Sequence, residues 1–130
     1  MAIVGAPVTD WRLYDTAYTE RYLGLPAKNS DGYDKSSVLK YIDGFPDEPN
    51  RLLIFHGLIG KNQIFWILGK FRLSDENVLF YHTTELLDGL TAACKPYDFK
   101  PLVQERHGLR SSSSINYYEM TVLNYLERNL

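Results

Sequence analysis

Two short polar segments hold the residues of this chain that are best suited to acid–base chemistry. Residues 75–78 are Asp-Glu-Asn-Val, and residues 105–108 are Glu-Arg-His-Gly. A carboxylate such as Asp75 can hold the imidazole of His107 in the tautomer that accepts a proton from a nucleophile, and can stabilise the charged ring afterwards. The two segments therefore indicate the acid and the histidine of a nucleophilic triad.

A purely structural interpretation of these two residues stays open. Asp75 could cap the helix that begins near Asn77, and His107 could be an ordinary surface histidine. A serine nucleophile normally lies in a Gly-x-Ser-x-Gly turn between a strand and a helix. No serine of this chain has such flanking glycines. The spacing alone does not decide between the two interpretations.

Aromatic residues at helical spacing form a third noteworthy segment. They recur at i, i+3, i+7 and i+11 and comprise Trp11, Tyr14, Tyr18 and Tyr22. Such a stripe is common in a protein core. Aromatic walls also suit proline, which is apolar and lacks a backbone donor. The two interpretations overlap, because a helix can pack part of its stripe and expose the rest at a cleft.

Strand and helix signals alternate along the chain. We expect strands at residues 3–8, 51–55 and 97–103, helices at 10–25, 38–42, 79–94 and 115–130, and a solvated loop at 28–37. The first strand should be buried, and residues 51–55 are continuously apolar, as in the interior of a parallel sheet. Alternating strands and helices predict βαβ units. The predicted fold class is α/β, with about three parallel strands and flanking helices.

The composition excludes several classes of protein. With 130 residues, the chain has room for one domain. A net charge of −2 gives no basic surface for nucleic acid, and no apolar run is long enough to span a membrane. The three histidines lack metal-ligand spacing, and no phosphate-binding Gly-Lys-Ser/Thr sequence is present. We therefore expect no metal and no cofactor. A single cysteine fits a reducing compartment, and we expect a cytoplasmic protein.

The motifs resemble the C-terminal end of prolyl oligopeptidase-type serine peptidases of the dipeptidyl peptidase IV subfamily. Four segments carry the resemblance: Tyr-Thr-Glu-Arg-Tyr at 18–22, His-Gly at 56–57, and the two segments at 75–78 and 105–108. Outside one insert, the likeness runs from about Ile3 to the end of the chain. The segments at 47–54 and 95–97 resemble the cytosolic branch of the subfamily most.

The resemblance implies an incomplete α/β-hydrolase domain over residues 1–130. It implies that Asp75 is the acid and His107 the histidine of the triad. It also implies a pocket for a penultimate proline, lined by Val8, Trp11, Tyr14, Tyr18, Asn77 and Val78. The serine is expected upstream of Met1, so the chain alone should be inactive. The substrates of the complete enzyme would be peptides with a proline in second place.

The resemblance allows an alternative in which the chain is a truncated, non-catalytic hydrolase fragment. Such a fragment would act, if at all, as an interaction module. In the family, the hydrolase domains dimerise through helices that correspond to residues 79–94 and 115–130. A homodimer through these two segments is therefore an expectation of either hypothesis.

Residues 60–74 have no counterpart in the family pattern and form an atypical insert between His-Gly and the acid. Residues 61–65 faintly echo residues 76–80, with Gly60 in the place of Asp75. If this first copy occupied the site, the acid would be lost. The second copy matches the family pattern completely and continues into the helix, so we favour Asp75. An unspliced in-frame intron would explain the insert, and sequencing the transcript across residues 58–76 tests this.

Overall fold

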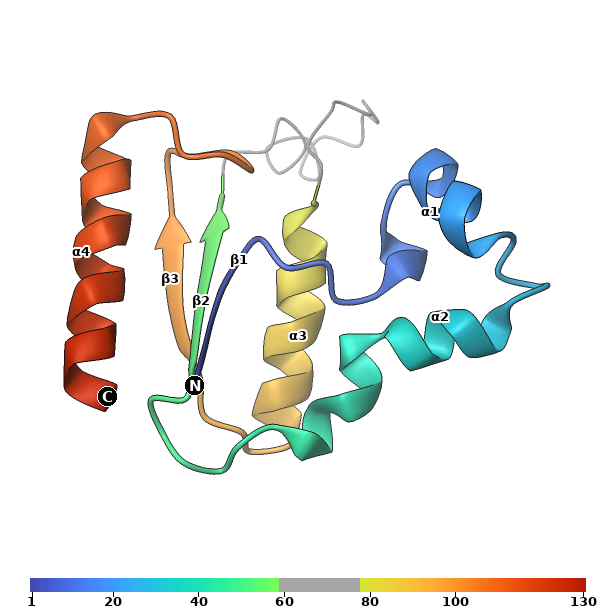
Figure 1. Cartoon of the computed structure of the whole chain (residues 1–130), viewed down its shortest axis with the longest axis horizontal. Coiled ribbons are helices and arrows are strands. Elements are labelled where there is room, and N and C mark those ends of the chain that lie inside the picture. Colours follow the sequence, from blue (N-terminus) through green and yellow to red (C-terminus); the bar gives the residue numbers. More distant parts are fainter. Residues whose placement is uncertain (59–77) are drawn as a thin grey trace.

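Three parallel strands form the centre of the structure, a computed structural model that describes residues 1–58 and 78–130. Strands β1 (Ala2–Gly5), β2 (Leu52–Gly57) and β3 (Asp98–Leu102) lie in the order β1-β2-β3. Figure 1 shows that all three point the same way. The predicted parallel α/β sheet is therefore confirmed.

Two helices cover opposite faces of this sheet (Figure 1). They are α3 (Phe80–Ala92) and α4 (Ser112–Asn129), as predicted for residues 79–94 and 115–130. Successive residues of β2 point to opposite faces. Those facing α3 are Leu52 and Ile54, which pack with Leu86 and Leu90, whereas Leu53 and Phe55 pack with Leu102 and with Tyr125 of α4. The apolar run of β2 thus fits a strand buried on both faces.

Strand β1 is shorter and less buried than predicted. It ends at Gly5, because Ala6 adopts a positive φ of 42° and leaves the extended conformation. Ile3 and Val4 are only half-buried. β1 pairs with β2 through Ala2 opposite Leu52, and within residues 1–58 and 78–130 no other strand pairs with its outer edge.

The predicted continuous helix over residues 10–25 is wrong, since two separate helices occupy this region. They are η1 (Trp11–Leu13) and α1 (Thr16–Leu23). The carboxylate of Asp10 accepts from the backbone nitrogen of Arg12 at 2.7 Å, and that of Asp15 accepts from Ala17 at 3.1 Å. Each aspartate therefore starts a new helix, and the chain is extended between them.

The predicted loop over residues 28–37 is also wrong, because α2 (Ser30–Ser36) lies there. Asn29 caps this helix by accepting from the backbone nitrogen of Gly32 at 3.2 Å. Tyr33 anchors it, with a buried ring whose hydroxyl donates to the Gly24 carbonyl at 2.7 Å. A single buried aromatic residue in a polar sequence gives too weak a periodicity to predict a helix. The short helix expected next is the 3₁₀ helix η2 (Val38–Gly44).

Candidate active site

The rings of Trp11, Tyr14, Tyr18 and Tyr22 gather into one group, here named the aromatic cluster. Tyr14 contacts both Trp11 and Tyr18 edge-on, with ring centroids 5.6 and 5.5 Å apart. The ring centroids of Tyr18 and Tyr22 are 5.0 Å apart. The cluster forms although η1 and α1 are separate helices.

Much of the aromatic cluster is open to solvent. Trp11 and Tyr14 are half-buried, whereas Tyr18 is 50% exposed and Tyr22 is 68% exposed. The buried residue of α1 is instead Thr19. Aromatic rings that stay exposed forgo the hydrophobic free energy of burial, so a row of them indicates a binding surface more than a core. The stripe is thus packed on one side and open on the other.

The start of α3 lies close to the aromatic cluster. The ring of His82 is 6.2 Å from that of Tyr14, and the Thr9 nitrogen lies 3.3 Å from Nδ1 of His82. Val78, two residues before α3, is buried, and Val8 is half-buried. The structure therefore brings the segment that holds four predicted pocket residues, Val8, Trp11, Tyr14 and Tyr18, close to the segment that begins at Val78. Asp75, Asn77 and the insert at 60–74 lie outside the described residues.

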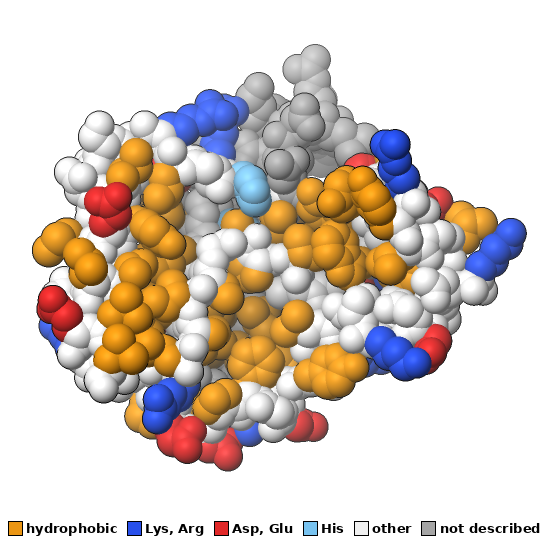
Figure 2. Space-filling view, viewed as in Figure 1, with side chains coloured by type: hydrophobic (Ala, Val, Ile, Leu, Met, Phe, Trp, Pro, Cys, Tyr) orange, Lys and Arg blue, Asp and Glu red, His pale blue; other side chains and the backbone are white. Residues whose placement is uncertain are grey.

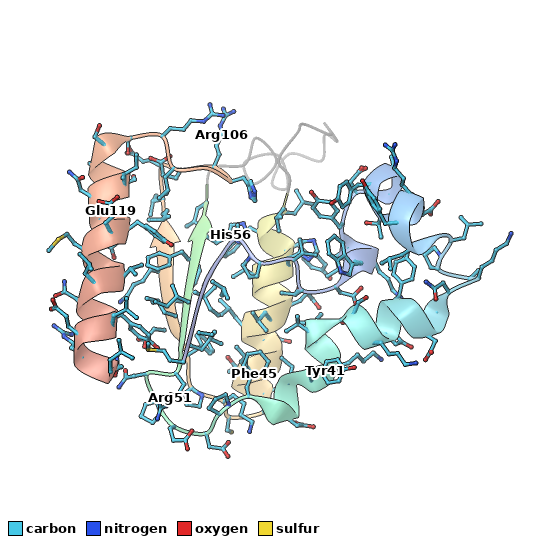
Figure 3. All side chains as sticks on the ribbon, viewed as in Figure 1. Tyr41, Phe45, Arg51, His56, Arg106 and Glu119 are labelled. Atoms are coloured by element: carbon cyan, nitrogen blue, oxygen red, sulfur yellow. The ribbon has the colours of Figure 1, made fainter. Side chains whose placement is uncertain are left out.

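His107 lies in the connection between β3 and α4, residues 103–111, here named the histidine loop. Its side chain is exposed. The loop begins at the carboxyl end of β3, where the Leu102 carbonyl accepts from the backbone nitrogens of Leu58 and Glu105 at 3.0 and 3.1 Å. Figure 3 shows His56 and Arg106 at this same end of the sheet.

A buried carboxylate closes the histidine loop. Glu105 accepts from the backbone nitrogens of Arg110 and Ser111 at 2.9 and 3.0 Å and from the Ser111 hydroxyl at 2.6 Å. These hydrogen bonds, that of the Ser111 hydroxyl first, lower the pKa of Glu105 to about 2. Ser111 also caps α4, since its Oγ accepts from the backbone nitrogen of Ser114. The ends of the loop are thus held together around His107.

His56 and Gly57 fix the end of β2 beneath the histidine loop. Nδ1 of His56 lies 2.7 Å from the hydroxyl oxygen of Thr83, and the ring contacts Phe80 edge-on at 5.2 Å. Burial lowers the pKa of His56 to about 4, an effect that the charges of His107 and His82 reinforce and the Val78 carbonyl opposes. The sequence indicated His56 and Gly57 as a His-Gly motif. The contacts of His56 with α3 depend on tertiary structure, so no local sequence pattern predicts them.

Residues 1–58 and 78–130 contain no group of three or more His, Cys, Asp or Glu side chains that could hold a metal ion. Among the helices described, none has both the length and the apolar character needed to cross a membrane.

Comparison with known proteins places this geometry in a family. The sequence profile described as the prolyl oligopeptidase family, Peptidase S9, matches residues 1–130. The chain belongs to the prolyl oligopeptidase family. Dipeptidyl peptidase 8 of Mus musculus and of Homo sapiens are each 47% identical to it over all 130 residues. Inactive dipeptidyl peptidase 10 of Rattus norvegicus is 34% identical over 122 residues, 94% of the chain.

The chain spans only about 13% of the length of each of these relatives. A crystal structure of Porphyromonas gingivalis dipeptidyl peptidase 4 resembles it with a TM-score of 0.79 and 28% identity, over 98% of this chain and 16% of that one. The three strands and their helices correspond to the C-terminal part of that hydrolase fold. The family and the incomplete α/β-hydrolase fold implied by the sequence motifs are therefore confirmed.

Proposed function

We propose that this chain is the C-terminal part of the catalytic domain of a serine-type dipeptidyl peptidase. Asp75 and His107 would be the acid and the histidine of its triad. The complete enzyme would release dipeptides from peptides with proline in second place, without a cofactor. A relative named as inactive shares 34% identity with the chain, so family membership by itself does not carry this activity.

The observation that carries the proposal is the contact of the aromatic cluster with the start of α3, which lies at the end of the sheet from which the histidine loop extends. Parallel strands of an α/β sheet point their carboxyl ends toward the ligand site. Here the loop with His107 and the start of α3 both lie at that end (Figure 1). Exposed Tyr18 and half-buried Tyr14 offer apolar faces for a proline ring.

The pocket would be completed from the other side by Asn77 and Val78. Val78 is buried, two residues before α3. Asn77 and Asp75 belong to the same Asp-Glu-Asn-Val segment, so the partner of the histidine and a pocket residue would come from one short stretch of sequence. An asparagine amide can orient a substrate carbonyl through a hydrogen bond. The single cysteine fits a reducing compartment, so the proposed location is cytoplasmic.

Hydrolysis of an Ala-Pro amide by the complete protein that contains this chain tests the proposal. The 130-residue chain alone should show no turnover, because acylation needs a hydroxyl or thiol beside His107 and none of its serines lies in a nucleophile turn. In the complete protein, His107→Ala should lower kcat by about 10⁴-fold or more. A kcat that His107→Ala leaves unchanged would refute the assignment.

A second candidate function, association through α4, is favoured by apolar residues on its outer face. Tyr117, Met120 and Leu123 recur every three residues and are each at least half exposed. Figure 2 shows hydrophobic side chains gathered on the α4 side of this view. Such a row indicates a surface that is covered in an assembly. The interface proposed comprises residues 79–94 and 115–130.

Sedimentation of the chain and of two variants tests this second candidate. The double variant Met120→Glu, Leu123→Glu should weaken self-association by at least tenfold. Tyr41→Glu, which places the same charge at an exposed aromatic residue of η2, should leave it unchanged. Association that persists in the double variant would implicate another surface, such as the outer edge of β1, and would exclude α4.

A further inference from the structure

The buried side chain of His82 links two segments that are far apart in the sequence. His82 lies in the first turn of α3, and both it and Thr9 are buried. The backbone nitrogen of Thr9 donates to Nδ1 of His82 at 3.3 Å, and the Thr9 hydroxyl donates to the His82 carbonyl at 2.9 Å. Two hydrogen bonds therefore hold the segment after β1 against the start of α3.

These contacts determine which ring nitrogen carries the proton. A backbone N–H can only donate, so Nδ1 of His82 must accept and is unprotonated. The proton of the neutral ring then lies on Nε2, which is buried and makes no hydrogen bond of good geometry with the described residues. Burial lowers the pKa of His82, whereas the Asp10 carboxylate and the Leu13 carbonyl act in the opposite direction.

The segment fixed by His82 leads directly into the aromatic cluster. The Thr9 carbonyl accepts from the backbone nitrogen of Val38 at 2.8 Å, and the next residue, Asp10, caps η1. The ring of His82 also lies 6.2 Å from that of Tyr14. Figure 1 shows that α1 stands apart from the sheet, beyond α3. The position of the cluster relative to Val78 therefore depends on ties such as that between Thr9 and His82.

We propose that His82 is a positioning residue that holds the aromatic cluster at a fixed distance from Val78, two residues before α3. These are the two walls of the proline pocket, so the inference rests on the proposed function. Nδ1 of the buried His82 ring performs this role by accepting the hydrogen bond from the Thr9 N–H. Without that acceptor the Thr9 N–H would be buried and unpaired, which favours displacement of the segment.

Two amide substitutions at His82 separate this role from a general effect on stability. In His82→Asn the side-chain oxygen takes the position of Nδ1 and can accept from Thr9. In His82→Gln the same chemical group lies one bond farther out, near the position of Nε2. The two variants carry the same amide and differ chiefly in reach. Both are made in the 130-residue chain, with Trp66→Phe so that Trp11 alone reports fluorescence.

Hydrogen exchange followed by mass spectrometry measures the tie directly. In His82→Gln, exchange in residues 6–14 should rise about five- to tenfold, while β3 is unchanged. In His82→Asn, exchange in both segments should stay within about threefold of the parent. Equal exchange of residues 6–14 in the two variants, or a rise that includes β3, would overturn the inference.

Binding of an Ala-Pro amide, followed by Trp11 fluorescence with an Ala-Gly amide as control, connects the tie to the pocket. His82→Gln should weaken Ala-Pro binding about tenfold, and His82→Asn should restore it. If the parent chain does not prefer Ala-Pro to Ala-Gly, the proposed pocket fails, whereas the exchange measurement still decides whether His82 positions the segment. Equal Ala-Pro affinity in the two variants would overturn the role of His82 in the pocket.

Discussion

The backbone carbonyl of Arg106 lies against Gly57, in the space that a Cβ atom of residue 57 would occupy. The Glu105 carbonyl crowds the same space. Both atoms belong to the histidine loop, and Gly57 is the last residue of β2. The absence of a side chain at this position therefore allows the loop that carries His107 to cross the end of the strand. The His-Gly motif thus has a steric basis in the described structure.

Replacing Gly57 by alanine should displace the histidine loop. The new Cβ would overlap backbone atoms, which cannot rotate away as a side-chain tip can. Overpacking of this kind costs about 1–3 kcal/mol of unfolding free energy. Urea denaturation of Gly57→Ala and of Gly44→Ala measures this cost. Around Gly44, no atom of the described residues outside its own helix backbone and chain neighbours lies within 4 Å of the position of a Cβ, so its substitution should change the free energy by less than about 0.5 kcal/mol. Equal stability of the two variants would show that the loop adapts without strain.

Removing the charge of Glu105 should loosen the histidine loop. Glu105→Gln replaces a carboxylate that accepts three hydrogen bonds, so the exchange rates of the Arg110 and Ser111 amides should rise roughly tenfold at pH 7. Glu119→Gln, on an exposed position of α4, serves as the matched control and should leave these rates unchanged. Figure 3 labels Glu119 on that helix. Amide exchange by NMR provides the measurement. Unchanged rates in Glu105→Gln would refute the role of the Glu105 carboxylate in holding the histidine loop.

The same carboxylate predicts a pH dependence with a definite sign. The folded pKa of Glu105, about 2, lies below its ordinary value of 4.5. Its contribution to stability is therefore fully present above about pH 4.5 and is lost as the pH falls toward 2. The difference in denaturation midpoint between the parent and Glu105→Gln should be largest at neutral pH and should shrink below pH 4.5. A difference that grew on acidification would contradict the assignment.

Acid should also destabilise the chain through His56. Its folded pKa of about 4 lies below the ordinary 6.5, so the neutral ring is favoured by folding. This contribution is complete above pH 6.5 and is lost as the pH falls toward 4. His56→Asn keeps a polar partner for Thr83 but cannot be protonated. Between pH 7 and 4.5, the Tm of the parent should fall by roughly 5 °C more than that of the variant. Parallel Tm curves would exclude His56 as a source of acid sensitivity.

Under the proposed function, deleting residues 60–74 in the complete protein should increase the rate at which it hydrolyses an Ala-Pro amide. Triad geometry tolerates displacement of only about half an ångström. If Asp75 is the proposed triad acid, fifteen extra residues ahead of it in the sequence would separate it from His107, an effect comparable to the roughly 10⁴-fold loss on removal of a triad acid. Assays of kcat/KM on an Ala-Pro amide, with and without the fifteen residues, check this. Equal values would mean that the acid is held in another way.

The strands and the two long helices were predictable because their signals are local. The apolar run at residues 51–55 and the periodic residues of 79–94 and 115–130 have the lengths and spacing of buried elements. The break between η1 and α1 was not predicted, although Asp10 and Asp15 are both good N-caps. The aromatic periodicity across them indicated one helix. Instead, the side chains of Asp10 and Asp15 each cap the start of a separate helix.

The site was predictable only as a set of motifs. The sequence indicated His107 and the aromatic residues, and the structure shows that Trp11, Tyr14 and Tyr18 gather on one surface. The contacts of His82 with Thr9 and of His56 with Thr83 join residues 73 and 27 positions apart. No periodicity or spacing marks such pairs, because they depend on how the helices pack against the sheet.

The pairing of β2 with both other strands also determines the order in which the sheet can assemble. Ala2 pairs with Leu52, and Leu53 pairs with Asp98, so β1 must wait for β2, and the other edge of β2 must wait for β3, which is made later still. Contacts of such long range slow folding, because the entropy of closing a large loop is lost before the strand pairing can stabilise the chain. During synthesis, β1 has no partner among the described strands until β2 has emerged. Folding should therefore begin on β2 and its local contacts, and mutations in this central strand should slow refolding more than equally destabilising mutations in α4.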